Sequence, residues 1–544
     1  MQGCVLSPLL FNIYLNSAVQ QINTNGLPGI PLGIDALQAN FQLNILLYAD
    51  DIVLTASSPA DLQTLMDALN MQMRKWGLQI NTDPVELKTS IVVFPRHRQQ
   101  FNPITLYIGS DPIHEINSYT YLGVIFSNNL LWNDAVHHRL ACAANKATIL
   151  PRLRYKQGWC PIKLAEEIYF ACVRPALDFC CEIWDTDLSN STSTDIENFH
   201  INIGRDFLQA SSSSQAITIR GELGWTLMSE RFDNLRLRFW QKCATLAPQR
   251  ETNNKQPSEV YPQPRFLLHA TYLWSKRVNS AWWIKTRRIL DECDLQEYYS
   301  PSSVQTDEAS RLLHIYEWTP IVQEAVQTRS MNRWKSDLAN LERVEKLETY
   351  IRIKTTLKRE RYLDEVSDNN MRRFLFQLRT GTCSNLLTEG ARTSNLYNYI
   401  PRHERTCRSC PAAPGSSTPL DDSLHFLTEC PAFNHLRSNL LHALQSEHAT
   451  LIALPSSSTT MSILDMARNV AIHDTLLGGP ITDELTNAQY HSLMFITKQY
   501  LFHSFALKRE IEPQLEKKQI KNKKLRTRWK NILRWKNPTR RSNN

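Results

Sequence analysis

Two adjacent aspartates, Asp50 and Asp51, constrain this chain more than any other feature, because an apolar run lies on each side of them at residues 46–48 and 52–54. Apolar runs around a short polar break predict a β-hairpin with the acids at its tip. Two like charges side by side are costly unless a cation is bound there. Carboxylate oxygens on a rigid turn suit Mg²⁺. The alternative is that the two residues simply form the turn, in which Asp is a favoured residue.

Further motifs accompany this pair and occur with it in a fixed order. They are QGCVLSPLLFNIY at 2–14, YADD at 48–51, GLQIN at 77–81 and YTYLGV at 119–124. Together they resemble the palm motifs of reverse transcriptases, most nearly those of non-LTR, LINE-type retrotransposons. Residues 169–185 and the motif GELGW at 221–225 resemble segments that follow the polymerase in LINE-type proteins.

The resemblance implies an RNA-directed DNA polymerase whose partners are an RNA template, a DNA primer and dNTPs. Asp50 and Asp51 would hold Mg²⁺ in a two-metal site, where cations about 4 Å apart stabilise the attacking and leaving oxygens. The remaining roles that it implies are a nucleotide and template pocket formed by Gln2, Gly3 and Pro8, and a primer grip formed by Tyr121, Leu122 and Gly123.

Two departures from the family pattern bear on activity. In the family, the first catalytic aspartate lies on a strand before the Gln-Gly loop, whereas this sequence begins at Met1, directly before Gln2. We therefore expect the fingers and that aspartate to be absent, and the chain as written to be inactive. Lys88 lies further from the preceding Ile-Asn than in LINE-type enzymes, so it is either a proton donor to pyrophosphate or a surface lysine.

Two other interpretations stay open on the sequence. The chain is either a retrotransposon-derived protein that binds zinc and nucleic acid without catalysis, or an incomplete gene model whose true start lies upstream. An open frame before Met1 that encodes a Phe-x-Asp motif would identify the second case.

Composition describes a globular intracellular protein. Hydrophobic residues make up 42% and charged residues 21% of the 544 residues, so we expect three or four folded domains rather than disorder. Twelve cysteines in so long a chain do not form a disulfide scaffold. We see no signal peptide and no run of about 18 apolar residues. We expect a nuclear or cytoplasmic location and no membrane partner.

The positive charge is concentrated at the carboxyl end. The formal net charge is +8, but twelve Lys or Arg and no acid follow residue 516, so subtracting them leaves −4 for the rest. Such a tail suits phosphate backbones, although it could also be a nuclear address or a solubilising terminus. The tail residues that we expect to bind nucleic acid are Lys517, Lys518, Lys521, Lys523, Lys524, Arg526, Arg528 and Lys530.

A second chemical site is predicted between residues 401 and 435. Cys407 and Cys410 form a Cys-x₂-Cys pair, and His425 and Cys430 follow after a gap of fourteen residues. Three thiols and one imidazole complete a tetrahedral set for Zn²⁺. Because all four positions are filled, the metal would be structural. His403 is a less favoured ligand, and unligated reduced cysteines are the alternative.

Hydrophobic periodicity predicts an α+β fold that is mostly helical beyond the palm. We expect helices over 7–21, 61–76, 135–150, 163–184, 198–207, 230–246, 266–290, 321–361 and 488–530, and strands over 78–80, 89–94 and 119–126. The expected domains are a partial reverse-transcriptase palm at 1–126, a thumb-like helical domain at 127–246, a linker at 247–264, a helical connecting region at 265–400, a zinc module at 401–435, a helical region at 436–516 and a basic tail at 517–544.

Overall fold

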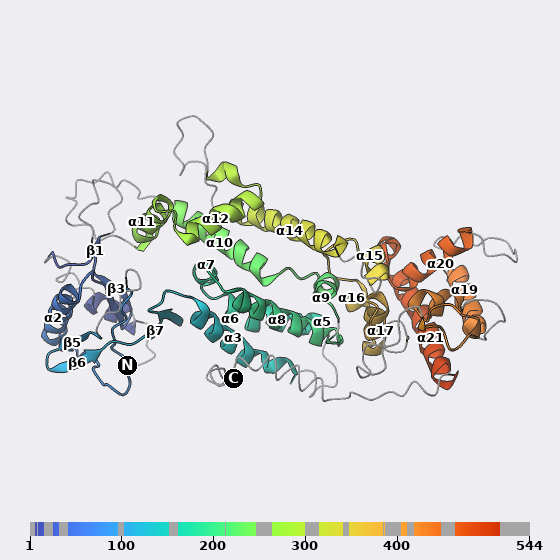
Figure 1. The fold of residues 1–544 in the computed structure, drawn as a ribbon, viewed down its shortest axis with the longest axis horizontal. Coiled ribbons are helices and arrows are strands. Elements are labelled where there is room, and N and C mark those ends of the chain that lie inside the picture. The colour runs from blue at the N-terminus through green and yellow to red at the C-terminus, as the bar shows by residue number, and fades with distance from the viewer. Residues whose placement is uncertain are drawn as a thin grey trace. The chain divides into compact units, whose positions relative to one another are not determined.

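The structure of this chain is a computed structural model. It describes residues 6–7, 9–15, 26–31, 42–95, 103–151, 161–212, 214–245, 264–299, 315–340, 347–383, 386, 404–410, 418–447 and 463–511. These residues are mostly helical, with small antiparallel sheets, so the fold is α+β (Figure 1). Among the described helices, none is long and apolar enough to cross a membrane.

The chain divides into two compact units. The first contains Met1–Arg139, Phe179–Thr192 and Phe232–Glu324, and the second contains Leu140–Asp178, Ser193–Arg231 and Ala325–Asn544. The described residues of the first unit form four two-stranded antiparallel sheets. Their strands are β1 (Ile30–Pro31) with β2 (Gln42–Leu43), β3 (Ile45–Tyr48) with β4 (Asp51–Leu54), β5 (Thr105–Ile108) with β6 (Asp111–His114), and β7 (Ser118–Tyr121) with β8 (Val124–Ser127).

Helix α2 (Pro59–Lys75) supports the β3–β4 hairpin. The side chain of Ser58 caps it by accepting a hydrogen bond from the Asp61 amide. The helix ends at Lys75, with Trp76 as its C-cap, and Gly77 follows with a φ of 67°, which suits glycine. Its buried Leu69 and Met73 form a core with Leu15, against which apolar side chains of both strands pack. The hairpin is therefore attached to a helix rather than isolated in solvent.

Residues 119–126 form a hairpin rather than the single predicted strand. Leu122 and Gly123 have φ values of 46° and 78°, and this left-handed pair makes the tight turn of a two-residue β-hairpin. The strands predicted at 78–80 and 89–94 are also absent, except for one isolated bridge at Ile91. In the intervening loop Asn81 and Asp83 accept amide hydrogen bonds through their side chains, which competes with strand pairing.

The other helices that lie wholly or partly in the first unit are α3 (Asn133–Ala147), α7 (Cys181–Trp184), α8 (Asn190–Phe207), α10 (Met228–Thr245), α11 (Pro264–Arg277), α12 (Ala281–Glu292), the 3₁₀ turn η3 (Gln296–Tyr298) and α14 (Ile315–Ala339). Trp282 of α12 donates to the Glu182 carbonyl, and Lys285 forms a 2.7 Å ion pair with the buried Asp185. This aromatic and basic helix therefore packs within its own unit, as an ordinary amphipathic helix does.

The second unit also contains parts of α3, α8, α10 and α14. Its other elements are α5 (Ile162–Ile168), the π-helix η1 (Tyr169–Val173), α6 (Arg174–Asp178), α9 (Ala216–Leu223), α15 (Glu348–Ile353), α16 (Tyr362–Glu365), α17 (Asn369–Arg379), the π-helix η7 (His425–Glu429), the 3₁₀ turn η8 (Pro431–Phe433), α19 (Asn434–Glu447), α20 (Ile463–Leu476), the 3₁₀ turn η9 (Pro480–Glu484) and α21 (Asn487–Ile511). Its core is rich in aromatic side chains; Tyr169, His200 and Trp225 stack on one another, for example. The carboxyl-terminal helices α19 and α21 pack together.

Candidate functional site

The β3–β4 hairpin places both aspartates at its tip, as the sequence predicts. Tyr48 pairs with Asp51, so Ala49 and Asp50 form the two-residue turn and Asp51 begins β4. Both aspartates are exposed, and no salt bridge engages either of them among the residues that the structure describes. Ala49 has a φ of 53°, a conformation that costs an L-residue about 1–2 kcal/mol. Strain of this kind is characteristic of functional turns.

The tip of the β7–β8 hairpin lies within electrostatic reach of the tip of the β3–β4 hairpin. Burial and the negative charge of Asp51 both raise the pKa of Tyr121, so the Tyr121 ring lies within electrostatic reach of that carboxylate. The turn after Tyr121 is held by Arg139 of α3, which donates a 2.8 Å hydrogen bond to the Gly123 carbonyl. This contact could not be predicted from the sequence, because the two residues lie on separate elements.

Lys88 occupies a surface position in the loop between the hairpins. Its ammonium group lies 3.1 Å from the Glu86 carboxylate, and both side chains are largely exposed. The Lys88 carbonyl accepts a 2.7 Å hydrogen bond from the Tyr119 hydroxyl. These contacts describe an ordinary surface lysine in this structure.

Several predicted site residues lie outside the described residues. They are Gln2, Gly3 and Pro8 of the expected nucleotide pocket, His403, and the basic tail from Lys517 onward. The helical residues 9–15 beside the expected pocket are described. Tyr14 contacts Trp76 edge to face at a centroid distance of 4.9 Å, which joins this helix to the end of α2.

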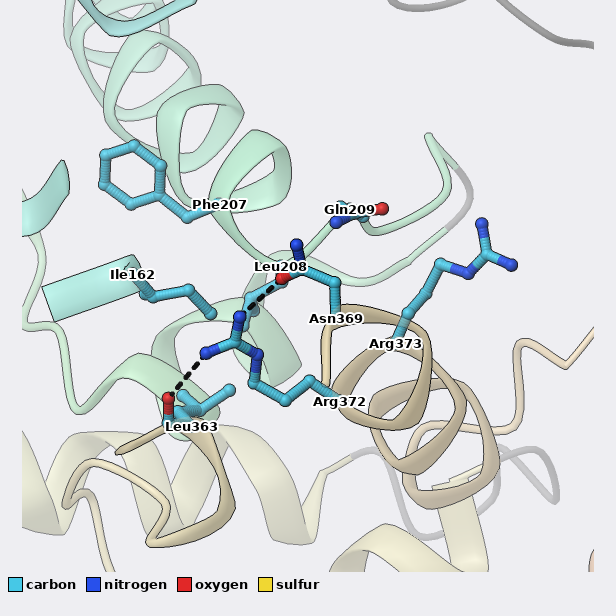
Figure 2. A pocket seen from close by; sticks show the side chains of 8 residues that line it. All are labelled: Ile162, Phe207, Leu208, Gln209, Leu363, Asn369, Arg372 and Arg373. Carbon is cyan, nitrogen blue, oxygen red and sulfur yellow. Dashed lines mark hydrogen bonds between the residues drawn. The ribbon is translucent and has the colours of Figure 1, made fainter. Parts of the chain in front are cut away.

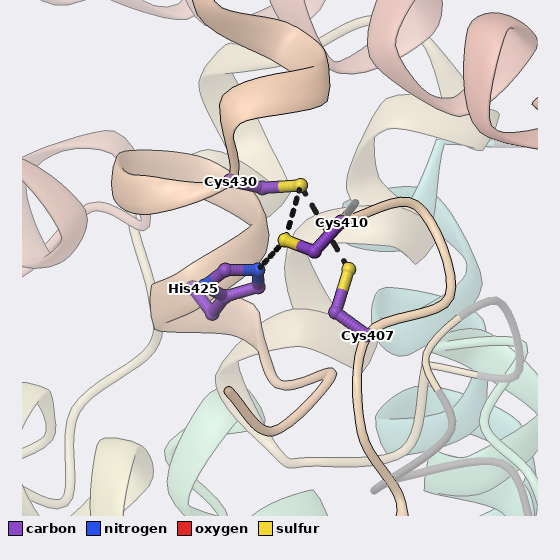
Figure 3. Close-up of side chains that lie close together, drawn as sticks. All are labelled: Cys407, Cys410, His425 and Cys430. Atoms are coloured by element: carbon purple, nitrogen blue, oxygen red, sulfur yellow. Dashed lines mark hydrogen bonds between the residues drawn. The ribbon is translucent and has the colours of Figure 1, made fainter. Parts of the chain in front are cut away.

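Cys407, Cys410, His425 and Cys430 come together in the second unit (Figure 3). Their ligand atoms all lie within 4.8 Å of one another, and within the described part of the chain no other group of three or more potential metal ligands is found. The Cys430 sulfur lies 3.8 Å from that of Cys407 and 3.7 Å from that of Cys410. Tetrahedral Zn²⁺ with Zn–S bonds of about 2.3 Å separates its sulfurs by about 3.8 Å. The donor set and the spacing therefore fit zinc.

Local structure turns each ligand inward. The backbone of Cys407 pairs with Pro419 next to an isolated bridge between Thr406 and Leu420, which brings the Cys-x₂-Cys pair beside η7. His425 begins that π-helix and directs Nε2 to within 3.2 Å of the Cys410 sulfur. On the other side of the ring, Nδ1 lies 3.6 Å from Glu429. A carboxylate behind a ligating histidine fixes its orientation in many zinc sites.

Contacts among the four ligands shift the pKa values of their side chains. Hydrogen bonds from Cys430 and His425, opposed by burial, lower the pKa of Cys407 to about 3. Burial alone would lower the pKa of His425, but its contacts with Cys407 and Glu429 raise it to about 10. The cluster thus favours a thiolate on Cys407, the form of cysteine that binds metal, whereas the contact with Cys407 raises the pKa of Cys430.

The cluster is embedded in the carboxyl-terminal helices. The Lys508 ammonium of α21 pairs with Asp421 at 2.8 Å, and both side chains are almost fully buried. The Tyr500 hydroxyl donates to the Leu427 carbonyl, and Arg437 of α19 donates to the Cys430 carbonyl at 2.7 Å. These bonds join the ligand-bearing segment to α19 and α21, so it is not an independent finger.

A buried ion network in the second unit was not predicted from the sequence. Arg379 and Glu222 are fully buried and lie 3.0 Å apart, and Arg379 also pairs with Glu360 at 2.7 Å. The Tyr362 hydroxyl donates to the other oxygen of Glu222. Glu222 belongs to the GELGW motif, which explains the motif as a structural feature: a Cβ on Gly221 would lie only 2.1 Å from the Tyr350 hydroxyl.

A small pocket beside α17 holds no arrangement typical of a catalytic site (Figure 2). The Arg372 side chain at its centre donates to the Leu363 carbonyl and to the Asn369 side chain. A Ser423–His473–Asp474 hydrogen-bonded series also occurs in this unit, at 3.2 and 3.0 Å. Ser423 and His473 are buried, so a substrate could not reach the hydroxyl, and the series links α20 to the segment before η7.

Comparison with known proteins identifies the first hairpin region. The sequence model described as reverse transcriptase (RNA-dependent DNA polymerase) matches residues 1–126. Residues 1–126 thus form a domain similar to reverse transcriptases.

A curated relative is the retrovirus-related Pol polyprotein from type-1 retrotransposable element R2 of Popillia japonica. It is 26% identical over 160 residues, which are 28% of this chain and 25% of the relative. The match thus spans about a quarter of the length of that relative.

Proposed function

We propose that this chain contributes the palm hairpin of an RNA-directed DNA polymerase of a non-LTR retrotransposon. The observation that carries the proposal is the strained turn that exposes Asp50 and Asp51 at the tip of the β3–β4 hairpin. Exposed carboxylates free of salt bridges suit a hard cation that exchanges with solvent and substrate. The partners would be an RNA template, a DNA primer and dNTPs.

In this proposal the two aspartates hold Mg²⁺ and the second hairpin seats the primer. Bound Mg²⁺ would favour loss of the proton from the attacking hydroxyl and would stabilise the negative charge that develops on the leaving pyrophosphate. Arg139 keeps the Gly123 turn in place, so that Tyr121, Leu122 and Gly123 present a fixed surface to the primer end. Gln2, Gly3 and Pro8 would border the incoming nucleotide.

Two carboxylates alone offer few ligands to a two-metal site, and no third one joins them among the residues described. We therefore expect the purified 544-residue chain to extend a primer no better than its Asp50→Ala and Asp51→Ala variants, with template, Mg²⁺ and dNTPs present. Extension by the unaltered chain that both variants abolish would show that the site is complete. Extension that neither variant affects would refute the role of the aspartates.

We also propose that Cys407, Cys410, His425 and Cys430 bind one structural Zn²⁺. The proposal is supported by the tetrahedral sulfur spacing and by a donor set with no open position for substrate. With the basic tail, this module would contact nucleic acid in the nucleus or cytoplasm. The domain boundaries proposed from the sequence, from the palm at 1–126 to the tail at 517–544, would then separate polymerase and binding functions.

The second candidate function is nucleic-acid binding without catalysis. It is favoured by one observation, that the four thiol and imidazole ligands form a full set whereas the described carboxylates do not. Filter binding of labelled RNA separates the two functions. A binding protein would lose RNA in the Cys407→Ser variant and be unaffected by Asp50→Asn, whereas a polymerase subunit that acts with a complementing chain would require Asp50 for extension.

A further inference from the structure

The three cysteines of the cluster differ in their access to solvent. Cys407 is 3% exposed and Cys430 is 0% exposed, so the surrounding structure shields both thiols from a dissolved reagent. Cys410 is only partly buried. Oxidation of a cysteine requires a reagent to reach its sulfur, so Cys410 is the position at which the cluster is open to chemical modification.

Cys430 is placed to react with an oxidised Cys410. The two sulfurs lie 3.7 Å apart (Figure 3), and a disulfide joins its sulfurs at about 2.05 Å, so they must approach by about 1.7 Å. Rotation about the side-chain bonds of the two cysteines can supply such an approach. The buried Cys407 sulfur also lies close to Cys430, at 3.8 Å, but neither member of that pair is open to solvent. The Cys410–Cys430 pair therefore combines proximity with access.

The backbone around Cys430 connects its sulfur to two helices. Arg437 of α19 donates to the carbonyls of Cys430 and Leu427, at 2.7 and 3.2 Å. Tyr500 of α21 donates to the same Leu427 carbonyl at 2.9 Å. Because these bonds hold the segment that bears Cys430, withdrawal of its sulfur from the metal site would also disturb the packing of α19 and α21.

We propose that Cys410 and Cys430 form a redox switch, in which a peroxide converts the two thiolates into a disulfide and the chain releases its Zn²⁺. This inference rests on the zinc site proposed above. The disulfide would leave Cys407 and His425 as the remaining ligands. Loss of two of four ligands should weaken zinc binding roughly 10⁴- to 10⁶-fold.

The chemistry has two steps that balance with hydrogen peroxide as the oxidant. In the first step the Cys410 thiolate attacks the peroxide, the O–O bond breaks, and an S–O bond forms on Cys410 as hydroxide leaves; the sulfur loses two electrons and the peroxide gains them. In the second step the Cys430 thiolate attacks the Cys410 sulfur, so the S–S bond forms and the S–O bond breaks. Each released hydroxide takes a proton from solvent, and a thiol reductant reverses the reaction.

The test treats the zinc-loaded full chain with hydrogen peroxide. A chromogenic chelator measures the released zinc, and mass spectrometry of a non-reduced digest identifies the disulfide. We expect one Zn²⁺ per chain to be released, a peptide pair linked through Cys410 and Cys430, and recovery of zinc binding after dithiothreitol. A chain that holds no zinc before treatment would refute the zinc site, whereas a loaded chain that forms no Cys410–Cys430 disulfide would refute the switch.

Two variants separate the accessible thiol from the other cysteines. Cys410→His removes the oxidisable sulfur but keeps a fourth ligand in a Cys₂His₂ set, so it should bind zinc and retain it in peroxide. The matched control Cys172→Ser removes an exposed cysteine of the same unit outside the cluster and should release zinc as the unaltered chain does.

Three results would overturn the proposal. The first is zinc release from Cys410→His as fast as from the unaltered chain, which would mean that the buried thiols react. The second is a Cys172→Ser variant that no longer releases zinc. The third is a linkage that joins Cys407 to either of the other two cysteines. If Cys410→His binds no zinc, the linkage found in the unaltered chain decides between the outcomes.

Discussion

Removing one ligand of the cysteine and histidine cluster should sharply weaken zinc binding. Cys430 is the informative position, because it is fully buried and its sulfur lies 3.7–3.8 Å from the other two sulfurs. Structural zinc sites contribute about 10–16 kcal/mol of apparent binding free energy at neutral pH. Shared equally over four ligands, this is about 2.5–4 kcal/mol for each. The Cys430→Ser variant should therefore bind Zn²⁺ roughly 10²- to 10³-fold more weakly.

The assay is competition with a chromogenic chelator, supported by the thiolate-to-Co²⁺ absorption of the cobalt-substituted protein. The unaltered chain should retain one metal ion per molecule, and Cys430→Ser should release it. Hydrogen exchange should rise in α19 and α21 at the same time, because Tyr500, Lys508 and Arg437 join these helices to the ligand-bearing segment.

The matched control is Cys383→Ser, which alters another fully buried cysteine of the same unit outside the cluster. Equal zinc affinity in the unaltered chain and in Cys430→Ser would refute the ligand assignment. Equal losses in Cys430→Ser and Cys383→Ser would show that a general folding defect, rather than a lost ligand, explains the result.

Three further predictions concern folding and the hairpins. Burial raises the pKa of Glu166 from 4.5 to about 7. The stabilisation from its protonated form is therefore complete below pH 4.5 and is lost as the pH rises through 7. In denaturant unfolding, the free energy of unfolding should fall by about 3 kcal/mol over this range, and the Glu166→Gln variant should not show this fall. Glu222→Ala should destabilise the chain by about 3–5 kcal/mol because it removes the fully buried one of the two carboxylates that pair with the buried Arg379. Glu86→Ala, in an exposed pair, should cost under about 1 kcal/mol, and equal costs would contradict the role of burial. Arg139→Ala should raise hydrogen exchange at the β7–β8 turn, and an unchanged exchange rate would refute its anchoring role.

Local signals in the sequence were sufficient for the elements with short-range causes. The Asp50–Asp51 hairpin, the Ser58-capped helix α2 and the convergence of Cys407 and Cys410 follow from turn, cap and ligand spacing. The hairpin at 118–127 was predicted as one strand because Leu122 gives no turn signal, although Gly123 does. Periodicity alone could not detect a two-residue turn inside an apolar run.

Contacts between distant residues could not be predicted in the same way. Glu222 and Arg379 are 157 positions apart, and nothing local marks either as a buried ion. Nothing local marks where the aromatic and basic residues of α12 pack, and Trp282 and Lys285 contact Glu182 and Asp185, each 100 positions away in the sequence. Likewise, the electrostatic proximity of Tyr121 and Asp51 depends on how two hairpins pack.

Iron-directed cleavage can show whether the β3–β4 turn is the divalent-cation site that we propose. Fe²⁺ bound in place of Mg²⁺ generates hydroxyl radicals that cut the nearest backbone, and the fragments are mapped by mass spectrometry. We predict Mg²⁺-competed cuts within residues 48–54 that persist in an Asp67→Asn control and disappear in the Asp50→Asn, Asp51→Asn double variant. Cuts that survive the double variant, or no cut at this turn, would contradict the account.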